Sequence, residues 1–195
     1  MSALPKEQQE RRFTYADYKA WELKEGERYE LIHGEAFAMA SPNTRHQAVL
    51  VELSTQFRVY LRGKPCRVYP SPCDVRLFYE EELGEKDDTV VQPDILVVCD
   101  ESKIGDEGIR GAPDLVVEIL SPSNTAIEME KKRSLYEEAG VREYWEVNPG
   151  HNEVTVHRLQ DDGFYDRKLY KAADTVPVGI LPGFSIELEQ VFTEV

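Results

Sequence analysis

The chain has 195 residues and a formal net charge of −14, and 41% of its residues are hydrophobic and 31% charged. This length and composition are typical of one soluble globular domain with a core of its own. The acidic balance argues against tight, non-specific binding to nucleic acid, because an acidic surface repels phosphate. No apolar run approaches the ~20 residues that a membrane-spanning helix needs.

The N-terminus and the cysteines favour the cytoplasm. The first twelve residues (MSALPKEQQERR) are polar and lack the apolar centre of a secretory signal. We expect residues 1–12 to form a flexible arm and residues 13–195 to form a single domain. The three cysteines, Cys66, Cys73 and Cys99, lack the spacing of a metal site, and their odd number does not suggest a disulfide framework.

The first part of the chain predicts a short helix, a hairpin and a longer helix. A threonine cap at Thr14 opens the short helix. The segment Tyr29–Met39 is typical of a β-hairpin that turns at His33-Gly34. Thr44 can cap a helix that begins at His46, and the apolar stripe of that helix runs to Leu61.

The remainder of the chain predicts strands around one further helix. Thr125 and Glu128 have the spacing of a capping box, which begins a helix after Thr125, and Gly140 ends that helix. An acidic turn at 80–88 and a glycine-containing loop at 102–111 separate strands. The predicted elements are the strands Arg67–Phe78 (interrupted at Ser71-Pro72), Val90–Asp100 and Ala112–Leu120, the helix Ala126–Ala139, the strand Glu143–Asn148, an appended hairpin of Val154–Leu159 and Phe164–Leu169, and a final strand or short helix at Ser185–Phe192.

Two acids stand beside apolar strands. Glu118 lies within the run LVVEIL, which is apolar on both faces and therefore indicates a central strand of a mixed or parallel sheet. A glutamate there costs several kcal/mol unless it is paired, protonated or bound to a cation. Asp94 precedes the similar run Ile95–Cys99. If the two strands are neighbours, the two carboxylates converge, and hard divalent cations prefer such ligands.

A lysine lies on the packing stripe of the predicted second helix. Lys132, Leu135, Tyr136 and Ala139 are spaced i, i+3, i+4 and i+7, so they share one face. The long side chain of Lys132 could reach solvent or lean over the sheet toward Glu118. A purely structural ion pair between Lys132 and Glu118 explains this pattern as well as an active site does.

Six phrases now support a resemblance: YELIHGE, SPCDVRL, VQPDILVV, APDLVVEILSPSN, KKRSLYEEAGVREYWEV and LPGF. In this order they resemble the Uma2 family (DUF820), restriction-endonuclease-like proteins of the PD-(D/E)XK superfamily, from about Phe13 to Phe192. The resemblance implies an α/β (α+β) fold with a restriction-endonuclease-like αβββαβ core. Helices would flank a central mixed sheet, with extra N-terminal and C-terminal β-hairpins.

The resemblance assigns Asp94, Glu118 and Lys132 to a catalytic site in which the two acids hold Mg²⁺ or Mn²⁺. In the common nuclease pattern the lysine stands two residues after the second acid, where this chain has Leu120. The Uma2-like pattern supplies the lysine from the following helix. This departure leaves the activity open, because the displaced lysine must be shown to reach the site.

Three further residues match the family pattern, each with a structural alternative. Asp74 is a candidate third acid facing the site. Glu30 completes the metal site or only orders its hairpin. His46, on the first turn of its helix, orients water or phosphate or is simply structural.

The resemblance implies a metal-dependent endonuclease that hydrolyses phosphodiester bonds of nucleic acid, with DNA the expected substrate and a homodimer the expected assembly. A basic cluster around the first long helix is a phosphate-binding patch or a solvated helix face; it comprises Arg45, Arg58, Arg62, Lys64 and Arg67. The competing hypothesis is a catalytically inactive binding or scaffold module on the same fold, which the acidic surface favours. A glycosidase with paired carboxylates would account for neither the lysine nor the six phrases.

Overall fold

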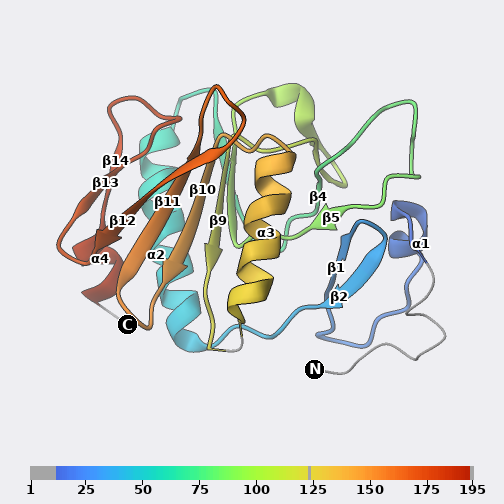
Figure 1. The fold of residues 1–195 in the computed structure, drawn as a ribbon, viewed down its shortest axis with the longest axis horizontal. Coiled ribbons are helices and arrows are strands. Elements are labelled where there is room, and N and C mark those ends of the chain that lie inside the picture. The colour runs from blue at the N-terminus through green and yellow to red at the C-terminus, as the bar shows by residue number, and fades with distance from the viewer. Residues whose placement is uncertain (1–11, 123, 194–195) are drawn as a thin grey trace.

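A central mixed sheet forms the body of the molecule (Figure 1), in a computed structural model that describes residues 12–122 and 124–193. The expected arm lies outside the described residues except for Arg12. The sheet has the strand order β12-β11-β10-β9-β6-β3. Only the β9–β10 pair is parallel among these neighbours. The strands are β3 (Arg67–Pro70), β6 (Ile95–Val98), β9 (Leu115–Ile119), β10 (Glu143–Asn148), β11 (Glu153–Leu159) and β12 (Tyr165–Lys171).

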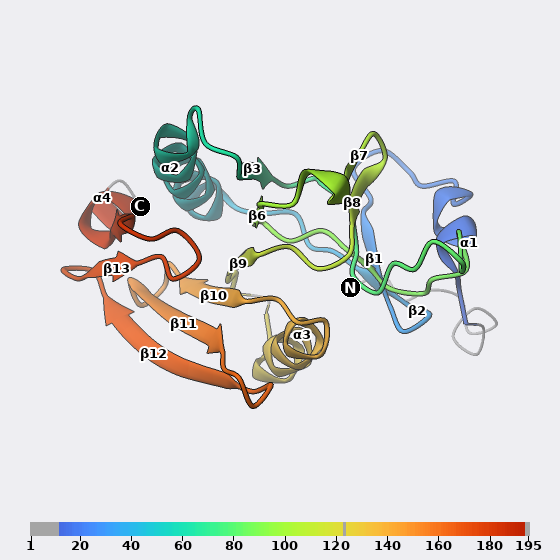
Figure 2. The same ribbon diagram turned by 90° about the horizontal axis from the view of Figure 1, so that it is seen from above.

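Helices α2 (Thr44–Leu61) and α3 (Ala126–Glu138) cover opposite faces of this sheet, as Figure 2 shows. Val117 of β9 packs in a cluster with the apolar side of α2, whereas its neighbour Val116 packs in a cluster with α3. Successive side chains of a strand point to opposite faces. The strand that carries Glu118 is therefore buried on both sides, as its sequence predicts.

A second, smaller sheet has the order β2-β1-β5-β4-β8-β7. The chain passes between the two sheets after β3 and again after β5. The predicted interruption of Arg67–Phe78 at Ser71-Pro72 is where the chain changes sheet, whereas Val90–Asp100 is wrong as one continuous strand because it contributes to both sheets. Pro72 and Pro93 lie at the two passages, and a proline has no N–H to continue a ladder. The strands are β1 (Tyr29–Ile32), β2 (Glu35–Ala38), β4 (Val75–Arg76), β5 (Val90–Val91), β7 (Ile104–Gly105) and β8 (Gly108–Arg110).

The segment 102–111 is not the irregular loop that we expect from its glycines. It contains a 3-10 helix at Glu101–Lys103 and the β7–β8 hairpin. Gly108 has a φ of 130°, and a Cβ there would lie 2.4 Å from the backbone oxygen of Asp74. Glycine thus lets β8 pack beside β4, where Ile109 N donates to Asp74 O at 2.8 Å.

Local signals place most of the helix ends and turns. The capping box of Thr125 and Glu128 opens α3, and Thr14 forms the same motif with Asp17 at α1 (Tyr15–Lys19). Asn43, and not Thr44, caps α2 by accepting from His46 N at 2.9 Å. His33 and Gly34 have φ values of 48° and 77°, as a type I′ turn requires.

The C-terminal part adds the predicted hairpin, formed by β11 and β12. Beyond it, β13 (Thr175–Pro177) and β14 (Ser185–Glu187) pair, and α4 (Leu188–Thr193) packs into the core cluster of α2. The last segment is therefore both strand and helix. Within the described part of the chain, no helix combines the length and the apolar character that crossing a membrane requires.

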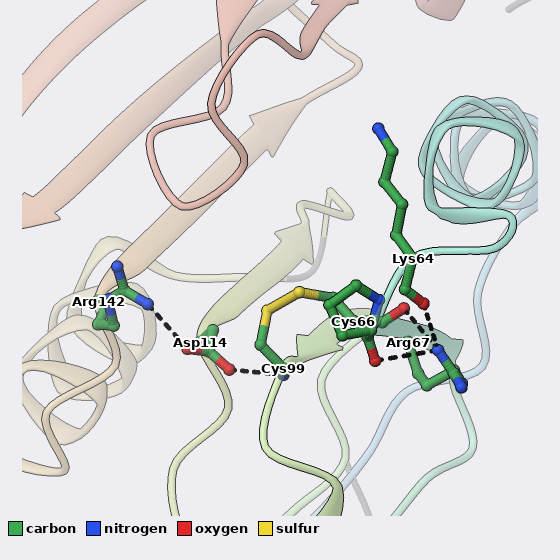
Figure 3. Close-up of a disulfide and its surroundings, with 7 residues drawn as sticks. Lys64, Cys66, Arg67, Cys99, Asp114 and Arg142 are labelled. Carbon is green, nitrogen blue, oxygen red and sulfur yellow. Dashed lines mark hydrogen bonds and ion pairs between the residues drawn. A yellow bond between two sulfur atoms is a disulfide. The ribbon is translucent and has the colours of Figure 1, made fainter.

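Cys66 and Cys99 form a disulfide (Figure 3), contrary to the expectation from their odd number. The register pairs Arg67 with Val98, so the two cysteines face each other one step beyond the β3–β6 ladder. Asp114 Oδ2 accepts from Cys99 N at 2.7 Å beside the bridge. Because disulfides are uncommon in the cytosol, the cysteines no longer support the cytoplasmic expectation.

Candidate active site

Asp94 and Glu118 meet where two neighbouring interior strands of the central sheet, β6 and β9, begin and end. The antiparallel ladder pairs Ile95 of β6 with Val117 of β9, and one further step places Asp94 opposite Glu118. Ile119 N donates to Asp94 Oδ2 at 2.7 Å, which fixes the aspartate against the end of β9. The convergence predicted from the two apolar runs is therefore present.

Glu118 is buried and held by two donors from α3. Lys132 Nζ lies 3.0 Å and the Tyr136 hydroxyl 2.6 Å from the same carboxylate oxygen, Oε1. Burial raises the pKa of Glu118 to about 7; the charge of Lys132 opposes this rise, and the carboxylates of Asp94 and Glu30 add to it. The group is thus poised to change its protonation near neutral pH.

Lys132 joins a carboxylate from each sheet. Its Nζ lies 3.1 Å from Glu30, which comes from β1 in the second sheet, as well as 3.0 Å from Glu118 in the central sheet. Burial alone would lower the pKa of Lys132, but the two carboxylates outweigh it and raise the pKa. The lysine therefore stays an ammonium ion and reaches the site from the helix that follows Glu118.

His46 completes the surroundings of Asp94. Its Nε2 lies 3.1 Å from Asp94 Oδ2, and its side chain is only 7% exposed on the first turn of α2. Its Nδ1 is buried and has no hydrogen-bond partner in the described structure. His46 thus lies against the candidate site, and its contact is with the aspartate.

Asp74 does not contact the site acids directly, and Gln92 lies between Asp74 and Glu30. Its Oδ1 accepts from Gln92 Nε2 at 2.7 Å and from the Tyr18 hydroxyl at 3.1 Å. Burial raises the pKa of Asp74, and these two hydrogen bonds lower it in part. Gln92 in turn donates its N–H to Glu30 Oε1 at 3.0 Å. The structure therefore connects Asp74 to the site through Gln92.

Three residues of this network, Tyr18, Gln92 and Tyr136, are not identified as site residues by the sequence. Tyr136 shares the helical stripe of Lys132, so its position one turn further along α3 was a usable signal. Gln92 carries no comparable signal. Its partners Tyr18, Asp74 and Glu30 are distant in the sequence and meet it only through tertiary packing.

The donor set suits a hard divalent ion held by few protein ligands. Among the described residues, no group of three or more His, Cys, Asp and Glu side chains is arranged to hold a metal. Mg²⁺ typically uses one or two carboxylates and keeps several waters. In the described part of the chain, the hydrogen bonds of these two acids use Asp94 Oδ2 and Glu118 Oε1, which leaves Asp94 Oδ1 and Glu118 Oε2 for such an ion.

The predicted basic cluster does not form one patch at the site. Arg45 lies on the first turn of α2 and donates to Asn152, whereas Arg62, Lys64 and Arg67 follow the other end of the helix. An 18-residue helix is about 27 Å long. A cavity of about 560 Å³ is lined by residues that are close in sequence to Glu118 and Lys132, among them Leu120, Met129 and Arg133, but Glu118 and Lys132 are not part of its lining.

Comparison with known proteins agrees with this architecture. A solved structure described as a "putative nuclease belonging to DUF820" from Anabaena variabilis superposes with a TM-score of 0.73. The match covers 93% of this chain and 98% of that one at 19% identity, so it supports the fold.

Two uncharacterized proteins of Synechocystis sp. are similar in sequence. One (slr1290) is 27% identical over 90% of this chain and 89% of its own length, and the other (sll1609) is 26% identical over 63% and 67%. The sequence model of the Uma2 family, described as "Putative restriction endonuclease", matches residues 15–189. The chain therefore belongs to the Uma2 family.

Proposed function

We propose that this protein is a metal-dependent nuclease that hydrolyses phosphodiester bonds of nucleic acid, with DNA as the expected substrate. The single observation that carries the proposal is the contact of Lys132 with Glu118 at the point where Glu118 faces Asp94. Two acids and one lysine from three different elements thereby share one site. Membership of a restriction-endonuclease-like family supports the same class of reaction.

In this proposal Asp94 and Glu118 would hold Mg²⁺ or Mn²⁺. Such an ion lowers the pKa of a bound water and stabilises negative charge on phosphate. His46 and Ile119 N hold the Asp94 carboxylate in place, and Tyr136 does the same for Glu118. Each acid thereby keeps a second oxygen that none of these donors contacts.

Lys132 supplies the positive charge that the reaction needs. A phosphodiester gains negative charge as water adds, and a fixed ammonium nearby stabilises that charge. With its side chain only 19% exposed, Lys132 lies where water screens its charge weakly. Its distance of 3.0 Å from Glu118 also allows it to orient a water near that acid.

The scaffold hypothesis predicts the same ion pair without a metal. A direct test is isothermal titration of Mg²⁺ and Mn²⁺ into wild-type protein, Glu118→Ala and a matched control, Glu146→Gln. Glu146 is the acid opposite Glu118 on β10, and its carboxylate lies 3.4 Å from His157. We expect saturable binding that Glu118→Ala abolishes and Glu146→Gln retains.

Cleavage is then measured on supercoiled plasmid DNA and on RNA with each ion and with chelator. We expect ion-dependent strand breaks that Asp94→Ala, Glu118→Ala and Lys132→Ala each remove. Absence of ion binding by the wild-type protein would reject the nuclease proposal and leave a nuclease-like fold that binds a partner. Binding without cleavage of either nucleic acid would reject the proposed substrate class.

A further inference from the structure

The ammonium of Lys132 occupies the space between two carboxylates that a bridging cation would otherwise fill. Its Nζ lies 3.0 Å from Glu118 Oε1 and 3.1 Å from both oxygens of Glu30. The two glutamates come from different sheets, and their side chains are only 9% and 5% exposed. Two buried carboxylates at such a separation repel each other unless a cation lies between them.

The oxygen atoms of Glu30 are already used. Its Oε1 accepts from Gln92 N and from Lys132, and its Oε2 faces Lys132 alone. Glu30 therefore differs from Asp94 and Glu118, each of which keeps one oxygen without a hydrogen bond or an ion pair in the described part of the chain. Asp94 Oδ1 and Glu118 Oε2 are together sufficient ligands for one divalent ion that keeps several waters.

We infer that Lys132 takes the place of a second divalent ion, so that the site binds one ion and Glu30 positions the lysine without ligating metal. This inference rests on the proposed function, because it presupposes the ion between Asp94 and Glu118. It assigns Glu30 a role distinct from the two expected from the sequence, which were completing the metal site and ordering the hairpin.

The inference predicts that removal of the lysine increases the number of metal ions bound. In Lys132→Ala, Glu30 and Glu118 face each other without a cation, and a second Mn²⁺ can bridge them. In the double variant Lys132→Ala/Glu30→Gln one of these carboxylates is gone, so the second ion is lost again. Lys132→Arg keeps a cation and therefore keeps one ion per chain.

The measurement is the number of Mn²⁺ ions bound per chain, from titration calorimetry and from electron paramagnetic resonance of free Mn²⁺. We expect one ion for the wild type, two for Lys132→Ala and one for the double variant. Glu30→Gln alone is expected to change the affinity for the first ion less than Glu118→Gln, which lowers it at least about tenfold. Circular dichroism confirms that each variant is folded.

The outcomes separate this inference from the proposed function. No bound ion in the wild type overturns both. Two ions in the wild type keep the nuclease proposal and overturn the inference. Any number other than two for folded Lys132→Ala overturns it as well. If Lys132→Ala does not fold, a tenfold or larger loss of affinity in Glu30→Gln overturns the inference, since Glu30 would then be a ligand.

Discussion

Two groups of buried charges in the described part of the chain are built differently. Arg76 and Asp87 form a pair with side chains 9% and 2% exposed, and Arg76 Nε donates to Asp87 Oδ2 at 2.7 Å. A second guanidinium nitrogen of Arg76 contacts Asp87 Oδ1 and Gly84 O. The Tyr15 ring covers the guanidinium at 4.1 Å. One positive and one negative charge cancel, and both carboxylate oxygens are paired.

The candidate site is unbalanced by comparison. Lys132 is the only lysine or arginine among three acids, Asp94, Glu118 and Glu30, in the contacts described above. Burial is the main cause of the raised pKa of Glu118, and the carboxylates of Asp94 and Glu30 raise it further against the opposing charge of Lys132. A closed, neutral pair serves the fold, whereas an excess of carboxylate with oxygens left over can accept a further cation. The comparison thus distinguishes a structural pair from a candidate active site within one molecule.

The largest effect that we expect comes from breaking the balanced pair. Arg76→Ala leaves Asp87 buried without its counterion and should lower the free energy of unfolding by about 3–5 kcal/mol. Urea denaturation followed by circular dichroism measures this loss. A change below about 1 kcal/mol would mean that Asp87 does not depend on Arg76, and the comparison would fail.

The candidate site should instead make the stability of the protein depend on pH. The folded-state pKa of Glu118, about 7, lies above its ordinary value of 4.5, so between these values the folded chain binds the extra proton. The contribution of Glu118 to stability is therefore full below about pH 4.5 and is lost as the pH rises through 7.

We expect the melting temperature of the wild type to fall between about pH 5 and pH 8, relative to Glu118→Gln, whose amide does not titrate. Differential scanning calorimetry without divalent ions gives both profiles. Parallel profiles for the two proteins would show that Glu118 titrates normally and would remove the contrast with Asp87.

A smaller effect sharpens the role of α3 in holding Glu118. Tyr136→Phe removes the hydroxyl that donates to Glu118 at 2.6 Å and leaves the ring in its apolar cluster. A hydrogen bond to a charged group contributes about 1.5–3 kcal/mol, so stability should fall by this amount above pH 7. Tyr144→Phe is the matched control, because the Tyr144 hydroxyl is buried without a partner in the described structure. Equal losses in both variants would contradict the assignment.

The smallest effect concerns the start of α3. Thr125→Ala removes a helix cap and should cost about 1 kcal/mol, because the amide of Glu128 loses its acceptor. Amide hydrogen exchange should then accelerate in the first turn of α3. Thr14→Ala removes the equivalent cap of α1 and serves as the control. Exchange that accelerates in α3 for both variants would show that the effect is general.

Local patterns predicted most of the helices and strands and identified two acids and a lysine as candidate site residues. The double-sided apolar runs identified Glu118 and Asp94, and the helical stripe identified Lys132. These signals depend on residues close in sequence, so they can be interpreted without the tertiary structure. The family resemblance then supplied Glu30, His46 and Asp74, but it could not tell which of them touches which.

The remainder depends on packing between the sheets. The contact of Glu30 with Lys132 joins residues 102 positions apart in the sequence. Asp87 lies in a segment that resembles a solvated acidic turn, so its pairing with Arg76 could not be predicted. The disulfide follows from the register of β3 and β6, and no local pattern in the sequence indicates that register.

The separate origins of the site residues mean that the site is reassembled whenever the chain folds. Glu30 and His46 precede the exposed acidic turn near Glu82, and Asp94, Glu118 and Lys132 follow it. If the protein were cleaved in this turn, neither fragment would carry the whole site. If two such fragments are mixed, recovery of ion binding would show that they have associated into the native fold. Ion binding can therefore be used to measure correct assembly of the chain.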